Sequence, residues 1–340
     1  MRKALVALAV LAQFLVLAVM AAEREYIVRY GRTVYLRTAP IDPRDVFRGD
    51  FVRLQYEISI IGPRDLRGDL PKRLKEKGRK VYSALTVGPD GLAELAYASD
   101  AAPAEGPYIR GRLIGRVHFG GPRGAAQVKY GIEQLFVEQG AGRAIEKRRG
   151  QREGLQVPLE VELGLSEGGT AVIKGYRWSR LGVRLEVLWS PPRRQVAVRG
   201  AEEGPLGPKL RVTLKNVSGE PLALANPGQD CGFELVATVW ARGRHDPVDR
   251  SCETVRATDA DLILLAPEAS HSVALDLSRP RWHVGDGDKT GEIGRLARSD
   301  RFRLVYRAPP EAVRRTLSNP DRVWAGRLPT PAFNSLGRLD

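Results

Sequence analysis

The chain begins with a long apolar segment, and this segment limits most strongly what the protein can be. Arg2 and Lys3 precede the run from Ala4 to Ala22, which only Gln13 interrupts. A helix of about 19 residues is roughly 28 Å long, close to the ~30 Å hydrocarbon core of a bilayer. Residues 1–22 are therefore predicted to be a transmembrane signal anchor that contacts the lipid bilayer through residues 4–22.

A cleavable signal peptide is the alternative for this segment. Small residues at Ala18, Ala21 and Ala22 offer a processing site, but the apolar region of a signal peptide usually has about 7 to 15 residues. The length therefore favours a retained anchor. Cations before the apolar run place the N-terminus in the cytoplasm. We therefore expect a single-pass membrane protein with the bulk of the chain extracytoplasmic, in the periplasm.

The chain has only two cysteines, Cys231 and Cys252. An oxidising compartment would let them form a disulfide, which would link two strands of one domain. Closing a loop of this size stabilises a fold by about 3 kcal/mol. Two unrelated buried thiols are the alternative.

The cations are spread along the chain. Lys and Arg number 54 against 40 Asp and Glu, a formal charge of +14 over 340 residues. Nucleic-acid-binding proteins gather their cations in a stripe or patch, so no nucleic-acid partner is expected. A solvated, arginine-rich surface fits better, and its field would also attract anionic lipid or cell-wall polymer. The length suffices for two packed domains.

The pattern between the N-terminal segment and residue 181 is mainly β. Short β-branched or aromatic runs are predicted as strands at Thr33–Leu36, Lys80–Val87, Leu92–Ala98, Tyr108–Phe119, Gln127–Val137, Val157–Leu163 and Ala171–Trp178. Helical patterns are few. Gly142–Arg149 is predicted to be a helix, and Pro71–Lys77 a short helix or a charged loop.

The stretch GDFVRLQY, Gly49 to Tyr56, follows a turn pattern. Asp42, Pro43 and Asp45 have the order that starts one helical turn, and Gly49 then ends it. Asp50 lies close to two cations, Arg44 and Arg48. An acid in this setting is more often a salt bridge or turn cap than an active-site acid.

A period of two follows from Asp50 onward and predicts a half-buried strand. Its inward side chains are predicted to be Val52, Leu54, Tyr56, Ile58 and Ile60, and its outward ones Phe51, Arg53, Gln55, Glu57 and Ser59.

Residues Leu36 to Tyr56, LRTAPIDPRDVFRGDFVRLQY, resemble the signature of the GDYXXLXY family, with Phe51 in place of the first Tyr. YGIEQLFVEQG, Tyr130 to Gly140, is similar to the second block of that family, and AVIKGYRW resembles its closing strand. The resemblance covers about residues 1–180. It implies a membrane-anchored exported protein that accompanies multi-spanning membrane proteins. It also implies a structural or partner-binding role for the residues of the first motif and for Tyr130, Gly131 and Glu133. At Phe51 the chain lacks the phenol that the family's tyrosine carries.

The remainder of the chain is predicted to be an immunoglobulin-like β-sandwich, residues 182–340, after an N-terminal β-rich domain, residues 23–181. ALDLS and RFRLVYRAP resemble the late strands of immunoglobulin-like modules. Its strands are predicted at Leu210–Asn216, Phe233–Trp240, Asp261–Leu265, His271–Leu277, Arg301–Tyr306 and Val323–Leu328. Such modules serve as platforms for binding or as spacers, and the fold alone assigns no ligand.

Motifs for catalysis are sparse. The histidines, His118, His245, His271 and His283, fall in no zinc-ligand motif, so neither a metal nor a cofactor is expected. Pro43 with Gly49 and an apolar strand resembles the entry strand of signal-peptidase-like serine proteases. Asp42 occupies the nucleophile position there, and a carboxylate cannot replace an activated hydroxyl, which leaves a degenerate fold of that type as one alternative.

The leading hypothesis is a noncatalytic membrane-anchored module that binds or assembles with a protein partner in the membrane or envelope. The alternative is a cell-wall or carbohydrate binder or hydrolase, with acids at Glu133 or Glu138. Its stacking faces would come from the indoles of Trp189, Trp240, Trp282 and Trp324. Buried indoles would remove the support for this alternative.

Overall fold

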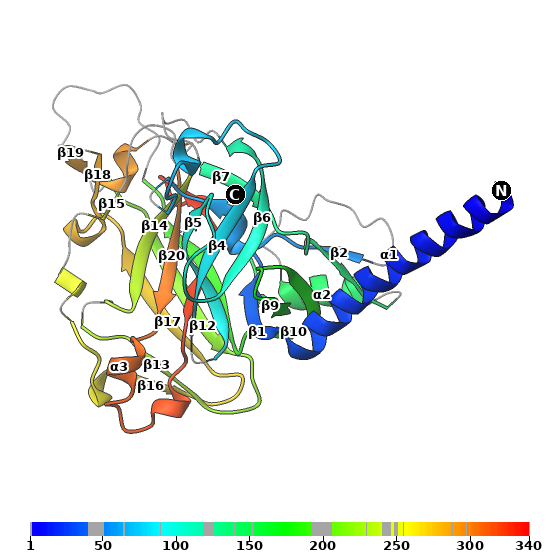
Figure 1. Ribbon diagram of the computed structural model, residues 1–340. Coiled ribbons are helices and arrows are strands. Elements are labelled where there is room, and N and C mark those ends of the chain that lie inside the picture. The colour runs from blue at the N-terminus through cyan, green and yellow to red at the C-terminus, as the bar shows by residue number, and fades with distance from the viewer. Residues whose placement is uncertain are drawn as a thin grey trace.

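A computed structural model shows a β-rich body from which one long helix projects (Figure 1). The structure describes residues 2–39, 51–63, 65–88, 90–117, 125–138, 141–150, 153–191, 206–228, 230–239, 246–247, 251–253, 255–286, 289–296, 298 and 300–339. The N-terminus lies at the free end of the helix, and the C-terminus lies within the body (Figure 1).

The projecting helix α1, Arg2–Tyr30, is longer than the predicted anchor. Its last turn docks on the body through Ile27, which is fully buried, and Gly164 approaches so closely that a Cβ there would lie 2.7 Å from the Ile27 carbonyl oxygen. Gly31 follows the helix and donates its N–H to that same carbonyl, at 2.9 Å. Within the described residues, no helix combines the length and the apolar character of a membrane span.

After α1, the described residues of the first half form strands, one further α-helix and two short 3₁₀ helices. The strands are β1 (Arg32–Arg37), β2 (Phe51–Arg53), β3 (Ile60–Ile61), β4 (Lys80–Val87), β5 (Leu92–Ser99), β6 (Tyr108–Val117), β7 (Ala125–Lys129), β8 (Gln134–Phe136), β9 (Leu159–Leu165) and β10 (Ala171–Trp178). The helical elements are η1 (Glu57–Ser59), η2 (Leu70–Lys72) and α2 (Ala141–Arg149).

Eight of these strands form one sheet in the order β10-β9-β1-β5-β4-β6-β7-β3. β1 pairs with β5 in parallel, whereas the other neighbours are antiparallel. One face of this sheet carries the first hydrophobic core, which draws on buried residues from Val34 to Leu165. The strands predicted at Lys80–Val87, Leu92–Ala98 and the hairpin Val157–Trp178 therefore lie close to their observed bounds.

Two predicted strands are broken, and both predictions were wrong in this respect. The run from Asp50 to Ile60 becomes β2, the turn η1 and β3, so the inward phase holds from Val52 to Ile58 and Ile60 points outward. The run Gln127–Val137 divides into β7 and β8. Gly131, between them, has a φ of +82°, a backbone conformation that reverses the chain and that favours glycine.

The second half of the chain is also β-rich. Its strands are β11 (Leu181–Trp189), β12 (Lys209–Asn216), β13 (Leu222–Ala225), β14 (Phe233–Val239), β15 (Asp246–Pro247), β16 (Leu262–Leu265), β17 (Ser270–Asp276), β18 (Val284–Asp286), β19 (Lys289–Gly291), β20 (Arg301–Arg307), β21 (Arg327–Pro329) and β22 (Phe333–Asn334). Its helical elements are η3 (Ser251–Glu253), η4 (Asp259–Asp261), η5 (Pro280–Trp282), η6 (Ile293–Arg295), α3 (Glu311–Arg314) and η7 (Pro320–Arg322).

The second hydrophobic core lies among small sheets. One has the order β11-β12-β17 and another the order β14-β20-β21, and buried residues from Leu181 to Phe333 fill the space that they enclose. The strand predicted at Val323–Leu328 is confined to β21, because the turn η7 comes directly before Val323. The remaining predicted strands correspond to β12, β14, β16, β17 and β20.

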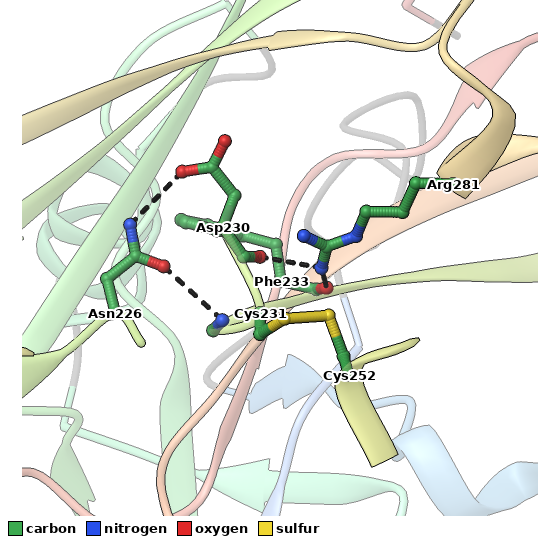
Figure 2. Close-up of a disulfide and its surroundings, with 7 residues drawn as sticks. Asn226, Asp230, Cys231, Phe233, Cys252 and Arg281 are labelled. Atoms are coloured by element: carbon green, nitrogen blue, oxygen red, sulfur yellow. Dashed lines mark hydrogen bonds between the residues drawn. A yellow bond between two sulfur atoms is a disulfide. The ribbon is translucent and has the colours of Figure 1, made fainter. Parts of the chain in front are cut away.

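Cys231 and Cys252 form a disulfide with a Cα–Cα distance of 5.3 Å, as predicted (Figure 2). The bridge links the turn two residues before β14 to η3, so the expectation that it joins two strands was wrong. Asp230 precedes it with a φ of +63°, and Asn226 and Arg281 hold this turn. The Arg281 guanidinium donates to the backbone carbonyls of Asp230, at 2.7 Å, and Phe233, at 2.9 Å.

Candidate functional site

The two signature blocks meet in one unit. β2 of the first block pairs antiparallel with β8 of the second, with Phe51 opposite Phe136 and Val52 opposite Leu135. The pairing continues one residue further, because the Leu54 N–H donates to the Glu133 carbonyl at 2.8 Å. Sequence segments about 80 residues apart therefore form a single structural element.

Two buried tyrosine hydroxyls connect the two signature blocks, because each donates a hydrogen bond to a backbone carbonyl in or just after the other block. The Tyr56 hydroxyl donates to the Ile132 carbonyl at 2.7 Å, and the Tyr130 hydroxyl donates to the Ile58 carbonyl at 2.8 Å. Ser83 of β4 lies 2.9 Å from the Tyr130 oxygen, which ties the unit to the large sheet. Burial, with a smaller effect of the Glu133 charge, raises the pKa of Tyr56 far above its usual range, so this phenol stays protonated and donates.

The carboxylate of Glu133 is used by its own turn. Its two oxygens accept from the backbone N–H groups of Tyr130, at 2.6 Å, and Gly131, at 3.0 Å. These bonds satisfy two donors where the chain reverses between β7 and β8. Glu133 therefore caps a turn in this structure.

The described part of the signature thus has a structural role at Leu54, Tyr56, Tyr130, Gly131 and Glu133. The other predicted motif residues lie outside the described residues, namely Asp42, Pro43, Arg44, Asp45, Arg48, Gly49 and Asp50. For Phe51 the structure describes the backbone pairing alone. Whether Asp50 caps a turn stays a prediction.

A second cluster, which the sequence did not indicate, lies where the two halves of the chain meet. On the first half it begins with Glu160 of β9, a buried carboxylate that accepts from Arg37 at 3.1 Å and from Arg177 at 2.8 Å. Arg177 also lies 3.7 Å above the ring of Tyr35 and donates to the Asp90 carbonyl. This face of the sheet, opposite to the first core, is therefore charged.

The facing surface belongs to β14, β20 and β21. Along β20, Phe302, Leu304 and Tyr306 enter the second core, which leaves Arg303 and Arg307 on the other face. Glu234 of β14 pairs with Arg327 at 3.2 Å and with Arg307 at 3.6 Å. Arg303 and Arg327 on this face lie near Glu57 of the first half, whereas Arg307 is exposed.

Glu57 lies directly after the signature, and its charge and that of Arg303 affect each other's pKa across this contact. Desolvation raises the pKa of Glu57, and Arg37 and then Arg303 oppose the rise. Desolvation also lowers the pKa of Arg303, with Glu57 opposing it. Glu57 is nonetheless exposed at the surface of the described structure, so solvent also contacts this residue. The Nε atoms of Arg37, Arg303 and Arg327 are buried without a hydrogen-bond partner in the described structure.

An open cleft of about 210 Å³ lies beside this cluster. The first half lines it with Asp90, Leu92 and Glu94, and the second half lines it with Arg314 and Arg327, among others. The arginines and the carboxylates therefore lie on opposite walls.

Sequence reasoning missed this cluster because its members come from positions 37 to 327 and follow no local motif. One signal was present, the alternation of arginine with apolar residues in RFRLVYR. Such an alternation usually marks a strand with one solvent-exposed face, and here a second part of the chain covers that face.

The tryptophans give little support to a stacking platform. Trp282 and Trp324 are buried in the second core, whereas Trp189 at the end of β11 is exposed. Trp240 lies outside the described residues. Among the described residues, no group of three or more histidine, cysteine or acidic side chains could hold a metal ion.

The fold and the interlocked signature blocks define a class, a mainly β protein with a protruding N-terminal helix. Residues 13–175 match the family model described as GDYXXLXY protein, and over this part the chain belongs to that family. Searches among curated proteins and solved structures returned no match.

Proposed function

We propose that this protein is a noncatalytic, membrane-anchored extracytoplasmic module that binds or assembles with a partner in the membrane or envelope. The N-terminal helix holds it at the bilayer, with the N-terminus in the cytoplasm. The β-rich body stands in the periplasm and presents its surfaces to that partner.

The exposed apolar surface of α1 is the observation that supports the proposed membrane anchor. The apolar run continues from residue 4 to residue 22, and side chains such as Val10, Phe14, Leu15 and Met20 point away from any other part of the described structure. An apolar surface of this length is unfavourable in water and favourable in lipid. Among the described residues, the main contacts of the helix with the body are those with β9 and β10, near its C-terminal end, and they leave the apolar run free to insert.

The binding role draws on the arrangement of the body. We place the boundary between an N-terminal domain, residues 23–181, and an immunoglobulin-like domain, residues 182–340, where the first core gives way to the second. The signature hydroxyls and the Glu133 carboxylate are occupied by internal hydrogen bonds, which argues against catalysis by these groups.

A matched pair of substitutions tests the anchor. Leu15 on α1 and Leu264 on β16 are both 65% exposed. An arginine at the centre of a membrane-spanning helix costs about 2.5–3.5 kcal/mol in insertion, whereas an exposed site in water tolerates it. We expect Leu15→Arg to move the protein from the detergent-extracted membrane fraction toward the soluble fraction, and Leu264→Arg to leave it in the membrane. Equal partition of the two variants would contradict the anchor.

N-terminal sequencing of membrane-extracted protein separates a retained anchor from a cleaved signal peptide. We expect the sequence to begin at or near Met1, and a mature chain that starts near Glu23 would show cleavage. Crosslinking in membranes followed by affinity capture then identifies the partner. Recovery of the chain without any crosslinked membrane or envelope protein would contradict the binding role.

A further inference from the structure

The cleft between the halves contains two charged groups without partners. Arg314, at the end of α3, is only 9% exposed, and within the described structure its guanidinium makes neither a hydrogen bond nor an ion pair. Glu94 of β5 lines the opposite wall and likewise has no polar partner among the described residues. An arginine and a carboxylate that line one cleft and are not paired within the described structure can each bind a ligand group of the opposite charge.

The neighbouring charges of the cleft are already paired. Glu234 holds both Arg327 and Arg307. Asp90 accepts from the Leu92 N–H at 3.1 Å and lies 3.9 Å from Arg177. Arg314 and Glu94 are therefore the two lining charges that remain for a ligand, one positive and one negative.

The walls of the cleft limit the size and shape of a ligand. The volume, about 210 Å³, is below the ~300–1,000 Å³ of most small-molecule pockets, so a large cofactor does not fit. Gly326 has a φ of +105°, and a Cβ there would lie 3.5 Å from the Leu92 side chain. Glycine at this position keeps the cleft open above an apolar residue, which suits a short alkyl group.

We propose that this cleft binds a small zwitterion, an amino acid or short peptide whose carboxylate pairs with Arg314 and whose ammonium group faces Glu94. Arginine binds a carboxylate with two charge-assisted hydrogen bonds. Asp90 and Glu94 on the other wall disfavour a ligand with only negative charge, such as phosphate. The site does not depend on the anchor, and its occupant is distinct from a membrane protein partner.

Ligand-observed NMR titrations of the full-length protein in detergent micelles test this assignment. The probes are alanylalanine, N-acetyl-alanylalanine, which lacks the ammonium group, alanylalanine amide, which lacks the carboxylate, and inorganic phosphate. We expect alanylalanine to bind about tenfold more tightly than each of the other three, because each of them loses one charge-assisted contact or meets an uncompensated charge. Equal binding of the three peptides, no binding of alanylalanine, or tighter binding of phosphate would overturn the proposal.

Two substitutions assign the charges. Arg314→Gln should weaken alanylalanine about tenfold and abolish the preference over the amide. Glu94→Gln should abolish the preference over the N-acetyl peptide. Arg322→Gln, at an exposed arginine of η7 away from the cleft, is the matched control and should change neither. Unchanged affinity in both cleft variants would mean that Arg314 and Glu94 meet each other directly in solution, and the proposal would be wrong. If Arg314→Gln fails to fold, as thermal unfolding would show, Glu94→Gln and the wild-type probe series still decide.

Discussion

Replacing Tyr56 with phenylalanine removes one oxygen atom from the interlocked signature blocks. The side chain is 1% exposed, and its hydroxyl is the donor that the Ile132 carbonyl accepts at 2.7 Å. Phenylalanine keeps the ring and its packing against the first core, so the substitution creates almost no cavity. The loss is confined to one hydrogen bond and one carbonyl left without a donor.

The expected cost follows from that carbonyl. A buried acceptor that loses its partner costs about 1–3 kcal/mol, because water cannot replace the donor. We expect Tyr56→Phe to lower the free energy of unfolding by about 2 kcal/mol, which corresponds to roughly 3 °C in Tm for a chain of 340 residues that unfolds as one unit. Tyr130→Phe should have a similar effect, since the Ile58 carbonyl accepts from Tyr130 in the same way.

Thermal and urea unfolding of the full chain in detergent measure this effect. Tyr176→Phe is the matched control, because Tyr176 is 41% exposed and its hydroxyl makes no hydrogen bond within the described structure. Its change should stay within about 0.5 kcal/mol. If Tyr56→Phe unfolds like Tyr176→Phe, the phenol does not hold the two blocks together, and a role in binding a partner becomes the better explanation of the motif.

Three further predictions concern the contact between the halves and the disulfide. Glu160→Gln should lower the free energy of unfolding by about 3–5 kcal/mol in urea titrations, because it leaves the Arg37 charge buried without its counterion, and a loss below 1 kcal/mol would argue against a dry contact. Desolvation raises the pKa of Glu57 above its ordinary 4.5, so the native state holds this proton more tightly than the unfolded chain, and the wild type should lose stability as the pH rises above about 4.5. Glu57→Gln lacks this loss, so its stability relative to the wild type should increase between pH 4 and pH 7, whereas a constant difference would show that the carboxyl is solvated. Cys231→Ala should cost about 3 kcal/mol for a bridge that spans 21 residues, and thiol labelling should find no free thiol at Cys252 in the unreduced wild type.

Local patterns predicted most strands of this protein and its disulfide. The hairpin of β9 and β10 has a turn, Ser166–Gly169, that its own residues specify, since the Ser166 hydroxyl and carbonyl accept from Thr170 and Gly169. The break after Arg53 was not predictable in this way, because period-two burial continues through the turn η1 and the pairing that ends β2 comes from β8. Local sequence describes which side chains are apolar, but the pairing partner sets where a strand ends.

The sequence by itself determined the apolar N-terminal helix, the mainly β character, the signature blocks and the pair of cysteines, because each depends on residues close together in the chain or on composition. The tertiary structure alone decided what those residues do. It paired Tyr56 with Ile132, and it brought Arg303 of β20 close enough to Glu57 for their charges to interact. The physical reason is that successive side chains of a strand point to opposite faces of the sheet. Only the packing of distant segments determines which face is solvated and which is buried against opposite charge.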